Sequence, residues 1–230
     1  LYGIPEAISS AVCTFPDLDC AVATVITTIQ YGVPVARIEL LDEAQIDAIN
    51  RYSKTDLTVA PTLFLEFHGS NQAVKDHAEV FHEVAADAGG SNFQWTTNTE
   101  ERNRLWQARH DAAYACKALR PDGEIWATDV CVPISQLAEC IRETQRDIKE
   151  SNLVAPIVGH VGDGNFHLVL LVDKNDPEEN ERAQQLHERM VIRSLAMGGT
   201  CTGEHVIGYV KLDFLIAEHG EAVSVMRAIK

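Results

Sequence analysis

The sequence predicts a protein of mixed helix and sheet, in which helices are packed on a sheet. Strand-like and helix-like segments alternate along most of the 230 residues, an order that often indicates a parallel sheet. Several of the strands, however, carry polar residues at alternate positions, as half-exposed antiparallel strands do. Helices on one face of an antiparallel sheet, as in ferredoxin-like units, fit at least as well. The pattern by itself leaves both arrangements open.

The first half of the chain is predicted to contain three strands, each followed by a helix. Strands are expected where apolar residues are continuous or alternate with polar ones, at residues 11–15, 35–41 and 61–68. Proline or capping residues begin the helices, and glycines close the first and the third, which indicates helices at residues 16–30, 42–52 and 70–88.

The second half continues the alternation. A short strand at 92–96 precedes a long helix at 99–119, whose leucine and alanine residues share one face. A strand at 124–132 and a helix at 133–149 follow. Two strands, at 155–160 and 165–172, are joined by a glycine-rich turn. A helix at 177–197 ends at Gly198–Gly199, and the residues from 211 onward are predicted to be helical.

Composition excludes several classes of function. Lysine and arginine number 19 and aspartate and glutamate number 34, so the formal charge is −15. This sign argues against a nucleic-acid-binding protein and against docking on an anionic membrane through a basic patch. No apolar run approaches the roughly 20 residues of a membrane-spanning helix. The chain ends within a helical pattern and is expected to be one domain of a longer protein.

The stretch VGHVGDGNFHLVLLV, residues 158–172, carries the clearest chemical signal. Asp163–Gly164 predicts a two-residue hairpin turn, and that register places His160 directly opposite His167, with Cβ atoms about 5 Å apart. Two imidazoles in this position can share one divalent metal ion, such as zinc. The plainer interpretation, two polar side chains with ordinary hydrogen bonds, stays open at this point.

A third ligand is expected from GGTCTGEHVIGYVK, residues 198–211. Glu204 can supply a carboxylate to the metal, and the adjacent His205 can act as an acid or a base. Two imidazoles and one carboxylate leave coordination positions open, which is typical of a catalytic metal site.

Arg109 is the remaining candidate, because its small alanine neighbours would let the guanidinium grip a carboxylate at two points. A surface ion pair is the plainer role for an arginine on a helix. Four other histidines are predicted to lie on solvated polar helix faces: His77, His82, His187 and His219.

These motifs resemble the carboxy-terminal domain of FAD-linked oxidases of the vanillyl-alcohol oxidase type. The subfamily that the chain resembles contains flavin-dependent, cytochrome-linked D-lactate dehydrogenases and glycolate oxidase flavoprotein subunits. The resemblance implies an α+β fold, with a large antiparallel sheet, helices packed on it and ferredoxin-like halves. It rests on GHVGDGNFH and GGTCTGEHVIG, and PVARIELLDE, APTLFLEFHG, ERNRLWQARH and TDVCVPIS extend it over nearly the whole chain.

The resemblance also implies roles for individual residues. His160, His167 and Glu204 match the family's metal ligands, for zinc or manganese, and His205 matches the general base. Arg109 matches the arginine that binds the substrate carboxylate, and Asn165 matches an asparagine beside the flavin. Residues 1–230 would then form the substrate and metal domain, with the FAD-binding domain outside this chain.

The implied reaction is the oxidation of D-lactate or a similar small 2-hydroxy acid to the 2-oxo acid, with hydride transfer to FAD. The electron acceptor would be a cytochrome, a quinone or an electron-transfer flavoprotein. The compartment would be the cytoplasm in a bacterium and the mitochondrion in a eukaryote. A glycolate oxidase subunit and a D-2-hydroxyglutarate dehydrogenase are the alternatives within this chemistry.

Two departures from the family's pattern bear on these expectations. Relatives usually have glycine where this chain has Val206, and a β-branched residue would be strained there if the position requires positive φ. Larger residues also replace small ones at Tyr209 and Val210. The hydroxyglutarate-specific relatives have a lysine where Ala127 stands, which favours a small monocarboxylate as the substrate. Outside the family, a metal hydrolase and a non-catalytic acid-binding module are the competing hypotheses.

Overall fold

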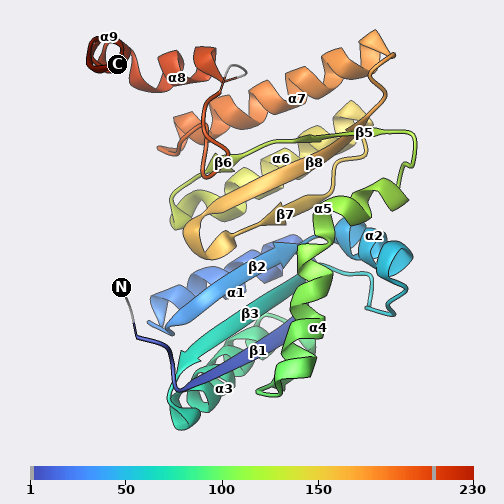
Figure 1. Cartoon of the computed structure of the whole chain (residues 1–230), viewed down its shortest axis with the longest axis vertical. Coiled ribbons are helices and arrows are strands. Elements are labelled where there is room, and N and C mark those ends of the chain that lie inside the picture. Colours follow the sequence, from blue (N-terminus) through green and yellow to red (C-terminus); the bar gives the residue numbers. More distant parts are fainter. Residues whose placement is uncertain (1–2, 209–210) are drawn as a thin grey trace.

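The computed structural model describes residues 3–208 and 211–230 and contains one eight-stranded sheet (Figure 1). The strand order is β4-β1-β3-β2-β7-β8-β5, and β6 pairs with β8. All neighbouring strands run antiparallel, which confirms the α+β prediction and excludes the parallel alternative. The strands are β1 (Ala7–Thr14), β2 (Val35–Leu41), β3 (Thr62–Gly69), β4 (Ser91–Thr96), β5 (Glu124–Ala127), β6 (Val130–Cys131), β7 (Ile157–Gly159) and β8 (Asn165–Val172).

The sheet consists of two related halves. In the first half, β1, α1 (Leu18–Gln30), β2, β3, α3 (Asn71–Asp87) and β4 follow the connectivity of a ferredoxin-like unit, with α2 (Glu43–Ser53) inserted after β2. In the second half, β5 and β6, α6 (Leu137–Ser151), β7, β8 and α7 (Pro177–Ala196) repeat the first five of those elements. The pairs Leu40–Gly159 and Leu41–Val158 join β2 to β7 and so connect the halves.

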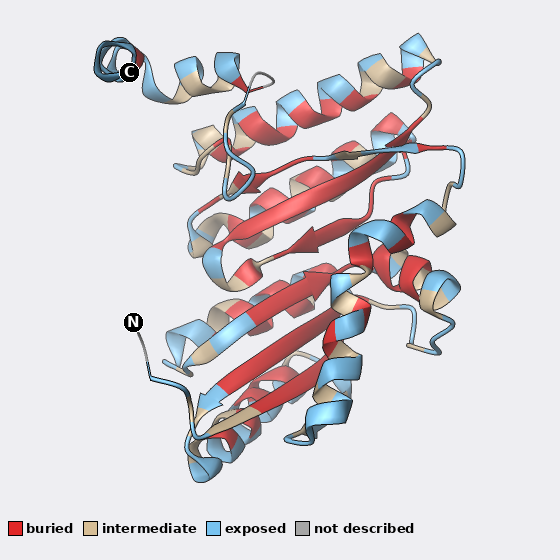
Figure 2. Cartoon of the chain, in the orientation of Figure 1, coloured by how far each residue is buried: buried red, intermediate tan, exposed pale blue. Residues whose placement is uncertain are grey.

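The main core lies between the sheet and the four helices α1, α3, α6 and α7. Fully buried side chains from each helix, such as Phe81 and Leu186, pack against the sheet residues Leu65 and Leu168. The strands β3 and β8 run through the buried interior of the molecule (Figure 2). Both faces of these strands are therefore covered along most of their length, which explains why their sequences are nearly continuous apolar runs.

The second face of the sheet is covered over only part of its area. The helices α2, α4 (Thr99–His110) and α5 (Ala112–Ala115) pack there through a smaller apolar cluster that includes Ile46, Trp106 and Phe64. Beyond this cluster the same face carries polar side chains at the junction of the halves. The candidate site lies at that junction.

Side-chain caps explain several helix starts. Asp17, Asp42 and Ser70 each accept a hydrogen bond from a backbone N–H in the first helical turn, as expected from the sequence.

Three predicted elements are interrupted. The helix predicted at 99–119 divides at Asp111 into α4, α5 and the short 3-10 helix η1 (Cys116–Ala118), and the strand predicted at 124–132 breaks between β5 and β6. The helical segment predicted from residue 211 onward forms two helices, α8 (Leu212–His219) and α9 (Ala222–Ile229), which are separated at Gly220 with φ 52°.

The predicted two-residue hairpin is wrong. β7 ends at Gly159, and a 3-10 helix η3 (Val161–Asp163), followed by Gly164 at φ 77°, connects it to β8. The register pairs Val158, rather than His160, with His167. The turn is longer because Val161 is buried in the core. A shift of two residues preserves the face of a strand, so the rings of His160 and His167 still lie 5.8 Å apart.

Before α6, a further 3-10 helix η2 spans Ile134–Gln136. Among the described helices, none combines the length and the apolar character needed to cross a bilayer.

Candidate metal and active site

The structure brings the three predicted metal ligands together from separate elements. His160 follows β7, His167 lies within β8, and Glu204 lies on the loop after α7. Their ligand atoms all lie within 4.8 Å of one another. Oε1 of Glu204 is 3.3 Å from Nε2 of His160 and 3.1 Å from Nε2 of His167. The described residues therefore form the donor set that the motif predicted.

Both imidazoles are held through their Nδ1 atoms. Nδ1 of His167 is 2.9 Å from the backbone oxygen of Thr128, and Nδ1 of His160 is 2.7 Å from Oε1 of Glu39. A carbonyl or carboxylate oxygen only accepts hydrogen bonds, so each Nδ1 donates, and in the neutral imidazole Nε2 then carries the lone pair. Both lone pairs then face the carboxylate of Glu204.

This arrangement fits a divalent cation. Nε2 of His167 is buried and forms no hydrogen bond within the part of the chain that the structure describes, although Glu204 lies close to it. Two nitrogen lone pairs beside a carboxylate repel one another unless a positive group lies between them, and a metal ion meets that need. In metal-ligating histidines, the ring nitrogen that does not bind the metal is also typically hydrogen-bonded, as Nδ1 is here.

The two imidazoles differ in their ionisation. Burial lowers the pKa of His167, which favours the neutral form that can bind a metal. The hydrogen bond to Glu39 raises the pKa of His160. Burial would raise the pKa of Glu39, but the hydrogen bond from His160 and the charge of Arg109 outweigh it, so the pKa lies below its usual value. Glu39 is therefore an anion.

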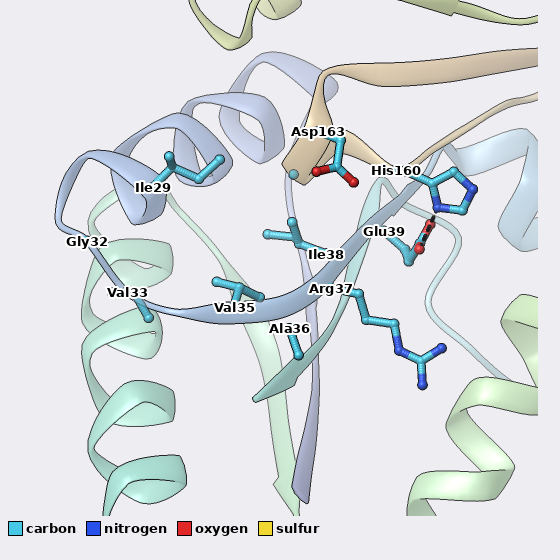
Figure 3. Close-up of a pocket in the computed structure, with 11 residues that line it drawn as sticks. Ile29, Gly32, Val33, Val35, Ala36, Arg37, Ile38, Glu39, His160 and Asp163 are labelled. Atoms are coloured by element: carbon cyan, nitrogen blue, oxygen red, sulfur yellow. Dashed lines mark hydrogen bonds and ion pairs between the residues drawn. The ribbon is translucent and has the colours of Figure 1, made fainter. Parts of the chain in front are cut away.

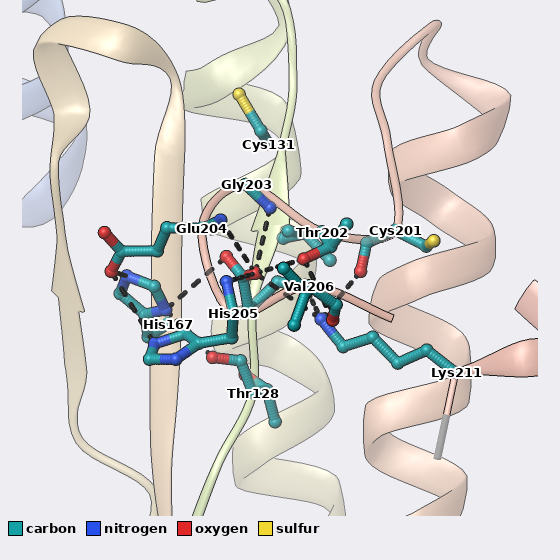
Figure 4. A network of polar contacts seen from close by, with 12 residues as sticks. Thr128, Cys131, His167, Cys201, Thr202, Gly203, Glu204, His205, Val206 and Lys211 are labelled. Atoms are coloured by element: carbon teal, nitrogen blue, oxygen red, sulfur yellow. Dashed lines mark hydrogen bonds and ion pairs between the residues drawn. The ribbon is translucent and has the colours of Figure 1, made fainter. Parts of the chain in front are cut away.

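The loop that carries Glu204 and His205 (Figure 4) is built around Asp129. Oδ2 of Asp129 accepts hydrogen bonds from the backbone N–H groups of Gly203, Glu204 and His205 at 2.9, 3.0 and 2.9 Å. The hydroxyl of Thr202 donates to the same oxygen at 2.7 Å. Successive backbone N–H groups that converge on one anion form a rigid concave turn.

Asp129 is itself buried and lies between β5 and β6. Burial would raise its pKa, but the hydrogen bonds from the loop outweigh this effect and hold the pKa well below its usual range. Nζ of Lys211, also buried, is 3.5 Å from Oδ2 and donates to the backbone oxygen of Asp129 at 3.1 Å. Asp129 was not singled out from the sequence. A charged residue within the apolar run that pairs with β8 was the available signal.

Asn165 is buried beneath this loop. Its Nδ2 donates to Oδ1 of Asp129 and to the backbone oxygen of Val130, both at 2.8 Å, while its Oδ1 has no hydrogen-bond partner among the described residues. A Cβ atom at Gly203 would lie 2.1 Å from Nδ2 of Asn165, so the loop requires glycine at that position. The predicted contact of Asn165 with a flavin stays a prediction.

Arg109 reaches the site through Glu39. Its Nε and Nη2 atoms donate to Oε2 of Glu39 at 3.2 and 2.9 Å, while Oε1 of the same carboxylate accepts from His160. The structure thus joins the predicted substrate-binding arginine and a predicted metal ligand to one buried carboxylate. Glu39 was not singled out from the sequence, although it alternates with apolar residues in β2.

A cavity of about 320 Å³ opens beside His160 and Glu39 (Figure 3). The end of α1, the first residues of β2 and the turn at Asp163 line it, and its walls include Ile29, Val33 and Val35. The cavity lies where β2 and β7 are no longer paired, because only two residue pairs join these strands.

His205 is exposed, with Nε2 3.6 Å from Oε1 of Glu204 and its ring edge-on to His167 at 5.2 Å. It therefore lies at the rim of the donor set. Val206 adopts φ 54°, so the condition under which a β-branched residue is expected to be strained there is met. The substitutions at Tyr209 and Val210 lie outside the described residues.

The prediction that His187 is solvated is wrong. Its ring is buried edge-on between Trp126 and Phe214, with centroid distances of 5.6 and 5.5 Å. Burial lowers its pKa to about 4. The polar helix pattern around His187 did not reveal that β5 and α8 pack against this part of α7.

Comparison with known proteins identifies the class of protein to which this fold and this site belong. The family model described as FAD linked oxidases, C-terminal domain, matches residues 4–230, and the chain belongs to this family. Over its whole length the chain is 50% identical to a probable mitochondrial D-lactate dehydrogenase of Danio rerio and covers 46% of that protein. It is 40% identical to the mitochondrial D-lactate dehydrogenase (cytochrome) of Arabidopsis thaliana and covers 41% of it. The chain thus spans less than half the length of these relatives.

A solved structure shows the same fold. The 4-ethylphenol oxidase from Gulosibacter chungangensis, in an isoeugenol complex, superimposes with a TM-score of 0.71 at 14% identity, over 99% of this chain and 51% of that one. At this level of identity the likeness concerns the fold alone.

Proposed function

We propose that this chain is the substrate- and metal-binding domain of an FAD-dependent D-2-hydroxy acid dehydrogenase that oxidises D-lactate. The observation that carries the proposal is the convergence of His160, His167 and Glu204 on one point, with Arg109 tied to the same cluster. The high identity to a relative named as a D-lactate dehydrogenase supports the choice of substrate.

The Nε2 atoms of His160 and His167 and the carboxylate of Glu204 would hold the metal, and zinc or manganese suits this donor set. A bound divalent metal supplies Lewis-acid polarisation of the substrate hydroxyl, which lowers the hydroxyl pKa. The protein's own contribution is to present both imidazoles in the tautomer whose lone pair faces the site.

Arg109 is the candidate for binding the substrate carboxylate. Its hydrogen bonds to Glu39 involve Nε and Nη2, and Nη1 takes part in no hydrogen bond within the described residues. A local cation is needed because the chain as a whole carries a charge of −15, which repels an anionic substrate.

His205 is the candidate for the general base. Its imidazole is exposed at the rim of the donor set and can accept the hydroxyl proton there. FAD, held mainly by a separate domain, supplies the hydride acceptor. Asn165 is the candidate for contact with the flavin from this side, because it matches the asparagine that the family places beside the flavin.

The remaining parts of the proposal concern specificity and partners. Ala127 leaves no cation at the position where a diacid would need one, which favours a small monocarboxylate over 2-hydroxyglutarate. The name of the Arabidopsis relative points to a cytochrome as the electron acceptor, and the names of both relatives point to a mitochondrial protein.

The test uses a protein in which this chain is joined to its FAD-binding domain. D-lactate added without oxygen should bleach the flavin absorbance, and His160→Ala and His205→Ala should abolish the bleaching. His219→Ala, a change of the same kind at an exposed histidine on α8, should leave it intact. D-2-hydroxyglutarate and glycolate, added separately, test the substrate.

Three results would contradict the proposal. A protein that binds no flavin would exclude it, as would hydrolytic activity of this chain with zinc alone. Bleaching that is unchanged in His205→Ala would indicate a module without a catalytic role for that residue.

A further inference from the structure

Glu39 is a buried carboxylate that two functional side chains share. It lies in β2 and is 5% exposed. Oε1 accepts the hydrogen bond of His160 Nδ1 at 2.7 Å, and Oε2 accepts two hydrogen bonds from Arg109 at 2.9 and 3.2 Å. Both oxygens are therefore occupied by groups of the candidate site.

The bond to Glu39 decides which nitrogen of His160 faces the metal ligands. A carboxylate can only accept, so Nδ1 carries a hydrogen, and in the neutral imidazole the lone pair is on Nε2, 3.3 Å from Oε1 of Glu204. His160 lies in the turn after β7 rather than within a strand. Its side chain is 34% exposed, against 7% for that of His167 within β8, so fewer neighbouring groups hold its ring in place.

Arg109 in turn fixes Glu39. The guanidinium approaches from α4, and its Nε and Nη2 atoms both donate to Oε2, which leaves Oε1 to accept from His160. The result is a chain of contacts, Arg109–Glu39–His160, that ends at the metal site. Carboxylates in this position orient a metal-bound imidazole and raise its basicity.

We propose that Glu39 is a positioning residue for the metal site, acting through His160. The inference rests on the proposed function, because it requires a metal at His160, His167 and Glu204. Glu39 is not a member of the metal-ligand group found among the described residues; it acts only by holding the imidazole.

The neighbouring strand offers a matched control. Glu66 in β3 is also buried, at 7% exposed, and it too binds one arginine and one histidine. Its Oε2 accepts from Arg37 at 2.8 Å and its Oε1 lies 2.7 Å from Nε2 of His68. His68 is not a member of the described metal-ligand group. Glu66→Gln therefore makes the same chemical change, with the same kind of partners, away from the metal site.

The experiment measures the zinc affinity of the 230-residue chain by competition with a chromophoric chelator. The proteins are the unaltered chain, His160→Ala, Glu39→Gln, Glu66→Gln and the double variant His160→Ala/Glu39→Gln. We expect Glu39→Gln to weaken zinc binding by about 10–100-fold and Glu66→Gln to leave it within about twofold. Because Glu39 acts through His160, Glu39→Gln should have no further effect in the His160→Ala background.

Each other outcome has a defined meaning. Equal losses in Glu39→Gln and Glu66→Gln, or an added loss in the double variant, would show a general structural effect and overturn the inference. Zinc binding that is unchanged in Glu39→Gln would overturn the inference and leave the proposed function intact. An unaltered chain that binds no zinc would overturn both. Thermal unfolding without zinc, compared between the two glutamine variants, separates a folding defect from weakened binding.

Discussion

The substitution Asp129→Asn tests whether one buried charge holds the loop that carries Glu204 and His205. Asparagine keeps the size of the side chain and one acceptor oxygen but removes the negative charge. Lys211 Nζ, 3.5 Å from that carboxylate, would then be a buried cation without its counter-charge. Removing one partner of a buried ion pair costs about 3–5 kcal/mol.

The geometry around Lys211 sets the size of the effect within this range. Nζ also donates to the backbone oxygens of Asp129 and Cys201 at 3.1 and 2.9 Å, and these dipoles remain in the variant. Against this, the hydrogen bonds from the loop to Asp129 become neutral and about half as strong. The two effects oppose one another, so we expect a loss of about 4 kcal/mol in the free energy of unfolding.

The measurement is urea denaturation followed by far-ultraviolet circular dichroism, without added metal. Asp163→Asn is the control, because Asp163 is exposed and its change should stay within about 0.5 kcal/mol. The low pKa of Asp129 adds a pH signature. Its stabilisation is complete above about pH 4, the unfolded value, and is lost as the pH falls toward the folded value. A loss below about 1 kcal/mol for Asp129→Asn, or an equal loss for Asp163→Asn, would refute the reasoning.

Three further predictions are tested by the free energy of unfolding or by zinc affinity. Val206→Gly should raise the free energy of unfolding by about 1 kcal/mol, because the exposed valine adopts φ 54°; no gain would show that the turn is unstrained. His187 has a folded pKa of about 4, so the unfolded chain binds more protons between pH 6.5 and 4, and stability should fall by about 3 kcal/mol as the pH is lowered through this window. His187→Leu should remove that part of the pH dependence, and an unchanged pH profile would contradict the assignment. Gly203→Ala should weaken zinc binding about tenfold or more, because its Cβ would displace Asn165 and with it the loop; full zinc affinity would show that the loop tolerates the side chain.

Periodicity and capping residues determined most of the helices and strands from local sequence. These signals depend on residues a few positions apart, so they carry no information about which strands are neighbours. The antiparallel order β4-β1-β3-β2-β7-β8-β5 is decided by tertiary packing. The hairpin shows the same limit: Asp163–Gly164 indicated a tight turn, but burial of Val161 in the core selected a longer one.

The residues of the site also fall into two groups: those recognised from the sequence and those recognised only in the structure. The motifs around His160, His167 and Glu204 pointed from the sequence alone to three side chains that the structure brings together, because each potential ligand type is recognisable by itself. Glu39 and Asp129 could not be identified in that way, since a carboxylate in a strand has no local signature for its partner. Glu39 binds His160 from 121 residues away, and Asp129 binds the backbone of His205 from 76 residues away. The sequence by itself therefore determined which groups can do the chemistry, and the tertiary structure decided what holds them in place, because hydrogen bonds between distant segments exist only once the sheet has brought those segments together.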